Sequence, residues 1–362
     1  MISFPSDKGI YAGFHFFEKV HDFPTRGASG VEHFTINGSL FLAFIEFNIP
    51  TSANNTSDAT IYKMKESTGR FSLYQTLQSY GSSDIEYFTI GEKHFLALDS
   101  LSKGGDRLNS SIYQWNGKVF VVIQKIPRNA PCRFTSFAIN NDKYLAVSNR
   151  VPRLFGAQPV VYKWTGSHFN KFKEVATYSA AGCVAFEISN NFFIAFADTN
   201  DSQGSTVFKW TEGHLAKVQS LQTYGAHDVK SFQINGHIFL AFANLAFGGK
   251  KNINSFIYKW NGNKFDLFQS IPTRGAFALH PFVISGQPFL GVVNYQGDIQ
   301  KEDTKSVVYQ ASGSRFVNYQ EIPTHAATDM TSFEYKGDTY LAVTNTRNSH
   351  ESSINSALYK WV

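Results

Sequence analysis

The sequence predicts an all-β fold, a single seven-bladed β-propeller built from four-stranded blades. Aromatic residues make up 16% of the 362 residues, with 35 Phe and 17 Tyr, and they recur with β-branched residues in short runs that favour strands. The chain also repeats itself seven times at a spacing of roughly fifty residues, which is the period of propeller blades. These two observations predict the fold, and each element of the repeat supports it in turn.

Each repeat opens on an aromatic or apolar residue four positions before Gln or Glu. The seven copies are Phe14 to Glu18, Phe71 to Gln75, Phe120 to Gln124, Phe169 to Glu174 (one residue longer), Leu215 to Gln219, Phe265 to Gln269 and Phe316 to Gln320. The repeat units cover approximately residues 14–70, 71–119, 120–168, 169–214, 215–264, 265–315 and 316–362. We predict that they form one domain spanning 1–362.

A hairpin follows in each unit. In the fifth copy an alternating strand ends at Phe232 to Ile234, the turn is Asn235-Gly236, and a second strand carries Leu240 to Phe242. Period-two alternation buries one face of a strand, and an Asn-Gly turn supplies the positive φ of a tight hairpin. The second strand always has a small central residue: Ala43, Ala97, Ala146, Ala195, Ala241, Gly291 or Ala342. We expect it to let neighbouring blades approach near the axis.

The third strand carries Tyr or Phe followed by Lys or Gln, and in five units it ends in Trp. Its tryptophans are Trp115, Trp164, Trp210, Trp260 and Trp361, and its lysines are Lys63, Lys163, Lys209, Lys259 and Lys360. The tryptophans could stack on sugar rings, but aromatics repeated at one strand position favour packing between blades. The lysines could form a ladder of ligand contacts, but their fixed position favours a structural role.

The order of the strands also predicts how the ring closes. The chain begins with a fourth strand at 14–20 and ends with a third strand at 357–361. We expect these two strands to pair within one blade, which would remove an exposed sheet edge.

Four segments of the repeat show a family resemblance: Gln269 to Ala276 (Gln-Ser-Ile-Pro-Thr-Arg-Gly-Ala), Asp228 to Phe232, Phe239 to Ala241, and Ile257 to Gly262. They closely resemble the epitempin, or epilepsy-associated, repeat (EPTP or EAR), and the resemblance covers residues 14–362. That family includes the leucine-rich glioma-inactivated proteins, whose extracellular propeller binds ADAM-family receptor ectodomains. The resemblance implies recognition without catalysis.

Composition and charge exclude several classes of protein. The net charge of +5 and the pI near 8.9 are mild for this length, so we expect no nucleic-acid partner. No stretch approaches the roughly 18 to 20 apolar residues of a membrane span, so we expect no membrane insertion. Residues 1–13 show no signal peptide. The resemblance nevertheless implies an extracellular or secreted location.

The sequence contains no motif of a catalytic site. A nucleophile elbow, a phosphate-binding loop, a His-Glu-x-x-His zinc helix and paired Cys ligands are absent, and the 11 His are scattered. We therefore predict no enzymatic activity and no cofactor. Cys132 and Cys183 lie in adjacent units, so a disulfide is conceivable, although buried free thiols are the simpler interpretation.

The variable loops point to a binding surface. The two tight turns of each unit share one face, the short-turn face, and the longer connections share the opposite face, the long-loop face. Loops held by a rigid scaffold are the usual place for binding. The candidate ligand-binding residues on the long-loop face are Arg26, Arg128, Arg133, Arg274, Lys250, Lys251, His227 and His325.

Arg26 and Arg274 occupy the same place in two copies of Pro-Thr-Arg-Gly-Ala. Guanidinium groups suit sulfate or carboxylate, although all of these residues could simply be solvated surface charges. The sequence therefore predicts lectin-like binding of acidic or sulfated glycans, such as glycosaminoglycans. The alternative is a protein-interaction propeller that binds a receptor ectodomain.

Three aspartates are weaker candidates for a metal site. Asp84, Asp228 and Asp329 precede the innermost strand of their units, so they could line the central channel and hold Ca²⁺ through oxygen ligation. Because only three of the seven units carry this Asp, capping or turn formation is the favoured interpretation.

Overall fold

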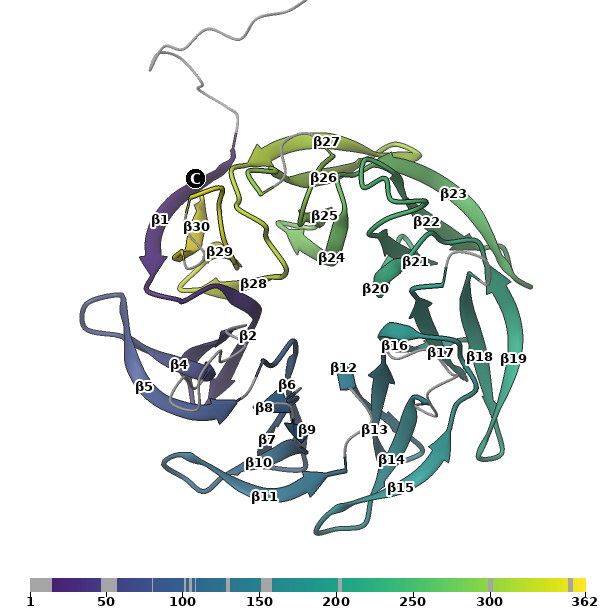
Figure 1. Cartoon of the computed structure of the whole chain (residues 1–362), viewed down its shortest axis with the longest axis horizontal. Coiled ribbons are helices and arrows are strands. Elements are labelled where there is room, and N and C mark those ends of the chain that lie inside the picture. The colour runs from purple at the N-terminus through teal and green to yellow at the C-terminus, as the bar shows by residue number, and fades with distance from the viewer. Residues whose placement is uncertain are drawn as a thin grey trace, which may run out of the picture.

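The computed structural model describes residues 15–46, 57–79, 81–100, 102–103, 106–107, 109–127, 131–150, 158–200, 204–298, 302–350 and 354–362. Antiparallel sheets surround a central axis and form seven four-stranded blades (Figure 1). The predicted β-propeller is therefore confirmed. Blades 3 and 4 join into one continuous sheet through a bridge between Asn149 and Ala180.

The blades are numbered from β2, and each runs from the axis outward. The innermost strands are β2 (Ala28–Ile36), β6 (Ile85–Ile90), β12 (Pro131–Ile139), β16 (Ala180–Ile188), β20 (Ala226–Ile234), β24 (Ala276–Ile284) and β28 (Met330–Tyr335). The second strands are β3 (Ser39–Glu46), β7 (Lys93–Leu98), β13 (Asp142–Asn149), β17 (Asn191–Asp198), β21 (His237–Asn244), β25 (Gln287–Asn294) and β29 (Asp338–Val343).

The outer half of each blade contains the third and fourth strands. The third strands are β4 (Ser57–Lys65), β10 (Ser110–Trp115), β14 (Val160–Trp164), β18 (Ser205–Thr211), β22 (Asn254–Trp260), β26 (Ser306–Ser312) and β30 (Ser356–Trp361). The fourth strands are β5 (Arg70–Ser79), β11 (Phe120–Ile126), β15 (Phe169–Glu174), β19 (His214–Leu221), β23 (Phe265–Pro272), β27 (Arg315–Ile322) and β1 (Phe17–Phe23). A short ribbon, β8 (Ser102–Lys103) with β9 (Asp106–Arg107), lies outside the blades.

The ring closes as predicted, because β1 pairs with β30 in blade 7 (Figure 1). The register differs from the expected one. Phe17 pairs with Trp361, as Phe120 pairs with Trp115 in blade 2, so the blade position assigned to Phe14 belongs to Phe17. Phe14 itself lies outside the described residues.

Every outer strand has a β-bulge, and the bulges identify the equivalent residues of the seven fourth strands. The bulged residues are Val20, Tyr74, Ile123, Phe172, Val218, Phe268 and Tyr319. The residue directly after the bulge is Gln in five blades, but it is His21 in blade 7 and Lys173 in blade 3. Glu18 and Glu174 are therefore not the counterparts of the glutamines. Bulges twist a sheet edge away from pairing with other chains.

The glutamines after the bulges fasten neighbouring blades together at the perimeter. Gln75 of blade 1 donates its Nε2 hydrogen to the Phe120 carbonyl at 2.8 Å and accepts the Phe120 N–H at 2.9 Å. The same two bonds join Gln124 to Phe169, Gln219 to Phe265, Gln269 to Phe316 and Gln320 to Phe17. We call the contact between two neighbouring blades a seam. Five of the seven seams contain a glutamine that makes these two hydrogen bonds.

The hydrophobic core consists of seven clusters, and each cluster lies across one seam. The small central residues of the second strands lie fully buried in or beside these clusters. At Gly291 a Cβ atom would clash with the sulfur of Met330 in the next blade. The structure therefore agrees with the expectation that small residues allow close approach of the blades.

Two other features bear on the interpretation of the sequence. Cys132 and Cys183 are buried free thiols, so they form no disulfide. In the part of the chain that the structure describes, no helix is long and apolar enough to cross a membrane.

Candidate functional site

Arg133 is buried at the axis, between residues of blades 2 and 5. Its Nη1 atom lies 3.5 Å from Asp84 Oδ1, and its Nε atom lies 3.6 Å from Asp228 Oδ1. Burial acts to lower the pKa of the guanidinium, but the carboxylates of Asp228, Asp329 and Asp84 raise it above the ordinary value. Because Arg133 belongs to blade 3, Asp84 to blade 2 and Asp228 to blade 5, one side chain connects three blades.

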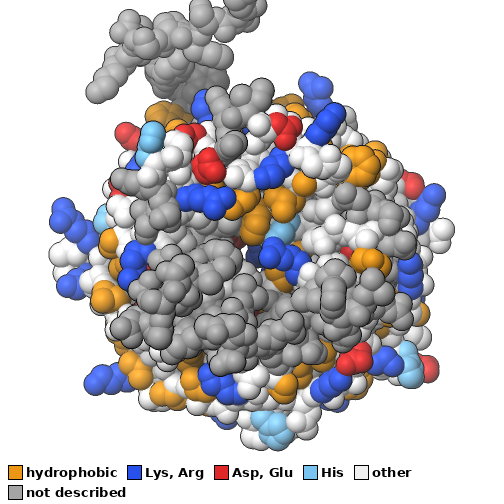
Figure 2. Space-filling model, viewed as in Figure 1, with side chains coloured by type: hydrophobic (Ala, Val, Ile, Leu, Met, Phe, Trp, Pro, Cys, Tyr) orange, Lys and Arg blue, Asp and Glu red, His pale blue; other side chains and the backbone are white. Residues whose placement is uncertain are grey.

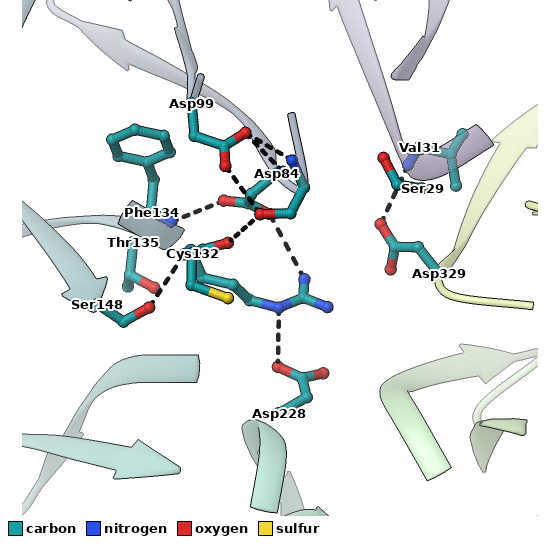
Figure 3. A network of polar contacts seen from close by, with 12 residues as sticks. Ser29, Val31, Asp84, Asp99, Cys132, Phe134, Thr135, Ser148, Asp228 and Asp329 are labelled. Atoms are coloured by element: carbon teal, nitrogen blue, oxygen red, sulfur yellow. Dashed lines mark hydrogen bonds and ion pairs between the residues drawn. The ribbon is translucent and has the colours of Figure 1, made fainter. Parts of the chain in front are cut away.

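The three axial aspartates also connect consecutive blades in a repeated way. Each accepts a hydrogen bond from a backbone N–H in the innermost strand of the next blade. The pairs are Asp84 with Phe134 (2.6 Å), Asp228 with Leu279 (3.0 Å) and Asp329 with Val31 (3.1 Å). This contact gives the aspartates a structural role between blades, which differs from the local capping or turn formation expected from the sequence (Figure 3).

The axis already contains its own cations. Asp228 Oδ1 makes no hydrogen bond within the described residues, and it lies near Arg133 and 3.8 Å from Lys230 Nζ. Among the residues that the structure describes, no group of three or more His, Cys, Asp or Glu is placed to hold a metal ion. The side chains at the axis therefore do not fit the calcium site considered from the sequence.

His227 is buried at the start of β20, the innermost strand of blade 5. Its Nε2 atom is 3.0 Å from Arg150 Nη1, and its ring centroid is 3.7 Å from that of Phe277. Burial and the charge of Arg150 lower the pKa of His227 well below its ordinary value, so the imidazole is neutral. The ring centroids of Phe277 and Tyr295 lie 5.4 Å apart, and the Arg347 guanidinium lies 5.8 Å from the Tyr295 ring. These residues form a series of aromatic and cationic side chains that starts at the axis.

A second group of aromatic and basic side chains forms on the long-loop face of blade 5. The blade-5 cluster consists of Tyr224, Phe247, Lys250, Lys251 and Arg274. The rings of Tyr224 and Phe247 have centroids 4.4 Å apart, and a tight turn brings Phe247 N within 2.9 Å of Lys250 O. The backbone N–H of the residue after Arg274 donates to Lys251 O at 2.6 Å. Three of the candidates predicted from the sequence therefore lie side by side.

The charges of the blade-5 cluster are only partly compensated. Lys251 Nζ donates to Gln296, whereas no described carboxylate pairs with the side chains of Lys250 and Arg274, which are both exposed. Phe247 is 45% exposed, so its ring is available to a ligand. On the face turned to the viewer in Figure 2, Lys, Arg and hydrophobic side chains adjoin the central opening.

The remaining candidates are separate from this cluster. Arg26 makes an ion pair with the buried carboxylate of Glu46, at 3.0 Å, and His325 Nδ1 lies 2.6 Å from Asp303 Oδ1. Arg133 and His227 are buried near the axis. Arg128 lies outside the described residues.

The sequence interpretation missed the residues that fix the long-loop face. Asn244 and Asn294 end the second strands of blades 5 and 6, and Asn345 follows that of blade 7. Each accepts a backbone N–H twenty positions earlier, at 2.9 to 3.0 Å. The donors are Tyr224, Arg274 and His325. The recurrence of Asn at the end of this strand was the available signal. Its effect is to hold the backbone of each presented side chain in the same position.

The sequence of the chain matches a known protein family. The sequence model of the EPTP domain matches residues 17–63, 70–116, 119–165, 168–211, 214–261, 264–310 and 315–362. The chain belongs to the EPTP family. The resemblance drawn from the repeat is thereby confirmed, and the EPTP repeats mark this propeller as a recognition domain.

Two relatives of this EPTP propeller are the "Thrombospondin-type laminin G domain and EAR repeat-containing protein" of mouse and of human. The mouse protein is 32% identical over 342 residues, which are 92% of this chain and 44% of the relative. The human match is 31% identical over 136 residues, 37% of this chain and 20% of the relative. The chain therefore spans less than half the length of these relatives.

The fold has a counterpart among solved structures. A candidate 6-phosphogluconolactonase from Bacteroides uniformis superposes with a TM-score of 0.60 over 88% of this chain and 94% of that protein. The sequences are 11% identical, so the likeness concerns the fold alone.

Proposed function

We propose that this EPTP propeller is a non-catalytic, extracellular recognition domain that binds acidic glycans, carboxylated or sulfated, through the blade-5 cluster. The observation that carries the proposal is the exposed Phe247 ring beside the uncompensated charges of Lys250 and Arg274. An aromatic ring offers an apolar surface to a sugar ring, and basic side chains form charge-assisted hydrogen bonds with sulfate or carboxylate.

The test is binding of the purified chain to heparin and to a neutral polysaccharide at low and at physiological salt. We expect heparin to bind and to weaken as salt rises, because exposed charges are screened. The double variant Lys250→Gln with Arg274→Gln should lose roughly tenfold or more in affinity, which corresponds to about 1.4 kcal/mol. Phe247→Ala should weaken binding as well.

A matched control removes two exposed lysines from the short-turn face of blade 2, Lys93→Gln with Lys118→Gln. It changes the net charge by the same amount, so it should bind as the wild type does. If the control weakens heparin binding equally, the binding depends on net charge and not on the blade-5 cluster. A lack of heparin binding at low salt would refute the proposal.

A second candidate function is binding of a protein ectodomain. The series His227, Phe277, Tyr295 and Arg347 beside the axis favours it, because aromatic residues and arginine are enriched at protein interfaces. Such binding should tolerate salt and should be weakened by Phe277→Ala, but not by the Lys250 and Arg274 double variant. A screen of the chain against extracellular ectodomains tests this candidate.

A further inference from the structure

The seam between blades 4 and 5 differs from three of the other seams on the short-turn face. In three seams the bulged residue of one blade stacks on the tryptophan of the next. The stacked pairs are Tyr74 with Trp115 (6.1 Å, 24°), Phe172 with Trp210 (5.5 Å, 11°) and Tyr319 with Trp361 (5.6 Å, 26°). An aromatic ring thus covers the indole in each of them.

Trp260 lacks such a cover. The bulged residue that precedes it is Val218, which is 50% exposed. The aromatic contacts of Trp260 in the described structure are an edge contact with Phe265 at 5.1 Å and a tilted contact with Phe193 at 6.0 Å. The place that a ring fills in three other seams therefore holds only the branched side chain of a valine.

A cavity of about 320 Å³ lies at this place, and Trp260, Val218 and Lys209 line it. A cavity of that size is at the lower end of the range for small-molecule sites, which is roughly 300 to 1,000 Å³. A second hollow borders the same tryptophan on the side of Phe268. The described residues that line the 320 Å³ cavity include Lys209 and Lys264 but no Asp or Glu, although Lys264 pairs with Asp266 outside the lining at 3.3 Å.

Lys209 also differs from its counterparts in blades 3 and 7. Lys163 pairs with Asp142 at 2.7 Å and Lys360 pairs with Asp338 at 2.8 Å, in both cases with the residue that opens the second strand. In blade 4 that residue is Asn191, which carries no charge. The described residues accordingly give the Lys209 ammonium no carboxylate and no aromatic ring.

We propose that this seam is a second binding site, separate from the blade-5 cluster, for a sugar residue that carries a carboxylate or a sulfate. The sugar ring lies against Trp260, where other seams hold an aromatic side chain. The acidic substituent meets Lys209, where blades 3 and 7 hold an aspartate. Both missing elements of the repeat are thus supplied by one ligand.

The experiment titrates the chain with a sulfated, uronate-containing disaccharide and follows tryptophan fluorescence and heat. Val218→Tyr restores the ring seen in the other seams and fills the cavity, so we expect it to lower affinity at least tenfold. Lys209→Gln should lower affinity by roughly fivefold, the loss of one charge-assisted contact. Both substitutions keep Trp260 in the core, so folding is preserved.

The matched controls are Val20→Tyr and Lys163→Gln. Val20 is the equivalent bulged residue, 47% exposed, but the next blade carries Met64 and not tryptophan at the facing position. Lys163 is the equivalent lysine with a carboxylate partner. Neither control should change the affinity for the disaccharide.

The Lys250 and Arg274 double variant separates this site from the blade-5 cluster. Disaccharide binding that persists in the double variant and disappears with Val218→Tyr supports the seam. Binding that disappears only in the double variant, or that survives Val218→Tyr, overturns the proposal, as does a lack of binding. Equal binding of a neutral disaccharide overturns the role of Lys209, and binding of benzoate without binding of the disaccharide overturns the sugar assignment.

Discussion

The perimeter and the axis of the ring join the blades in different ways. At the perimeter, five of seven seams have the same glutamine, which bonds to the backbone of the next blade. At the axis, Asp84, Arg133 and Asp228 occupy the same position of the repeat in three blades, yet two are acidic residues and one is basic. The perimeter repeats one contact, whereas the axis combines residues that differ from blade to blade.

The geometry of a ring explains the difference. A perimeter side chain reaches only the adjacent blade, and the backbone N–H and C=O that it contacts are present whatever the partner residue is. An axial side chain can meet blades that are not adjacent, as Arg133 of blade 3 meets Asp228 of blade 5. Charge must therefore be balanced over the whole ring, because an unpaired buried charge is costly.

Substitution of Arg133 should give the largest loss in the free energy of unfolding. Arg133→Met leaves the Asp228 carboxylate buried without its guanidinium, and breaking a buried ion pair from one side costs about 3 to 5 kcal/mol. Urea unfolding should show this loss, with Arg133→Lys losing less because it keeps the charge. A variant with Met at 133 that is as stable as the wild type would show that the axis does not depend on charge balance.

The pH dependence of stability should also report on the axis. Burial raises the pKa of Asp84 from 3.8 to about 8, although Arg133 and the Phe134 N–H act to lower it. The folded chain therefore holds a proton that the unfolded chain releases above about pH 4. This contribution to stability is fully present below the unfolded pKa and is lost as pH rises through about 8.

Asp84→Asn isolates that contribution from the other titrating groups. Burial lowers the pKa of His280 to about 3, and this buried histidine acts in the opposite direction, because it favours folding at higher pH. We expect the stability of the wild type relative to Asp84→Asn to be larger at pH 5 than at pH 8, measured by urea midpoints. A difference that stays constant between these pH values would contradict a protonated Asp84.

The contrast also explains how far the sequence could predict this molecule. The repeat predicts the blades, the small residues and the pairing of the termini, because these depend on local pattern and on neighbours. The register of β1 was predicted incorrectly, because His21 replaces the glutamine in blade 7, so the pattern Phe-x-x-x-Gln or Glu was assigned to Phe14 and Glu18, too early in the chain.

The axial contacts could not be predicted from the repeat. Arg133 and His227 were expected on the long-loop face, but β12 begins at Pro131 and β20 at Ala226, so both residues lie within innermost strands. Their partners are set by closure of the ring, which brings Arg133 and Asp228 together from non-adjacent blades. By contrast, Lys250, Lys251 and Arg274 could be proposed as a group because consecutive units place them on one face.

Substitutions at the perimeter should change the free energy of unfolding least, and one of them should raise it. Gln269→Leu removes two hydrogen bonds to Phe316 and should cost about 1 to 3 kcal/mol, because the backbone groups lose their partner. Lys173→Gln places the missing amide in the seam between blades 3 and 4 and should stabilise the chain by roughly 0.5 to 1.5 kcal/mol. Urea unfolding of the two variants tests both expectations. If Lys173→Gln gains nothing, the bridge between Asn149 and Ala180 already fastens that seam, and the uniform perimeter contact has a local substitute.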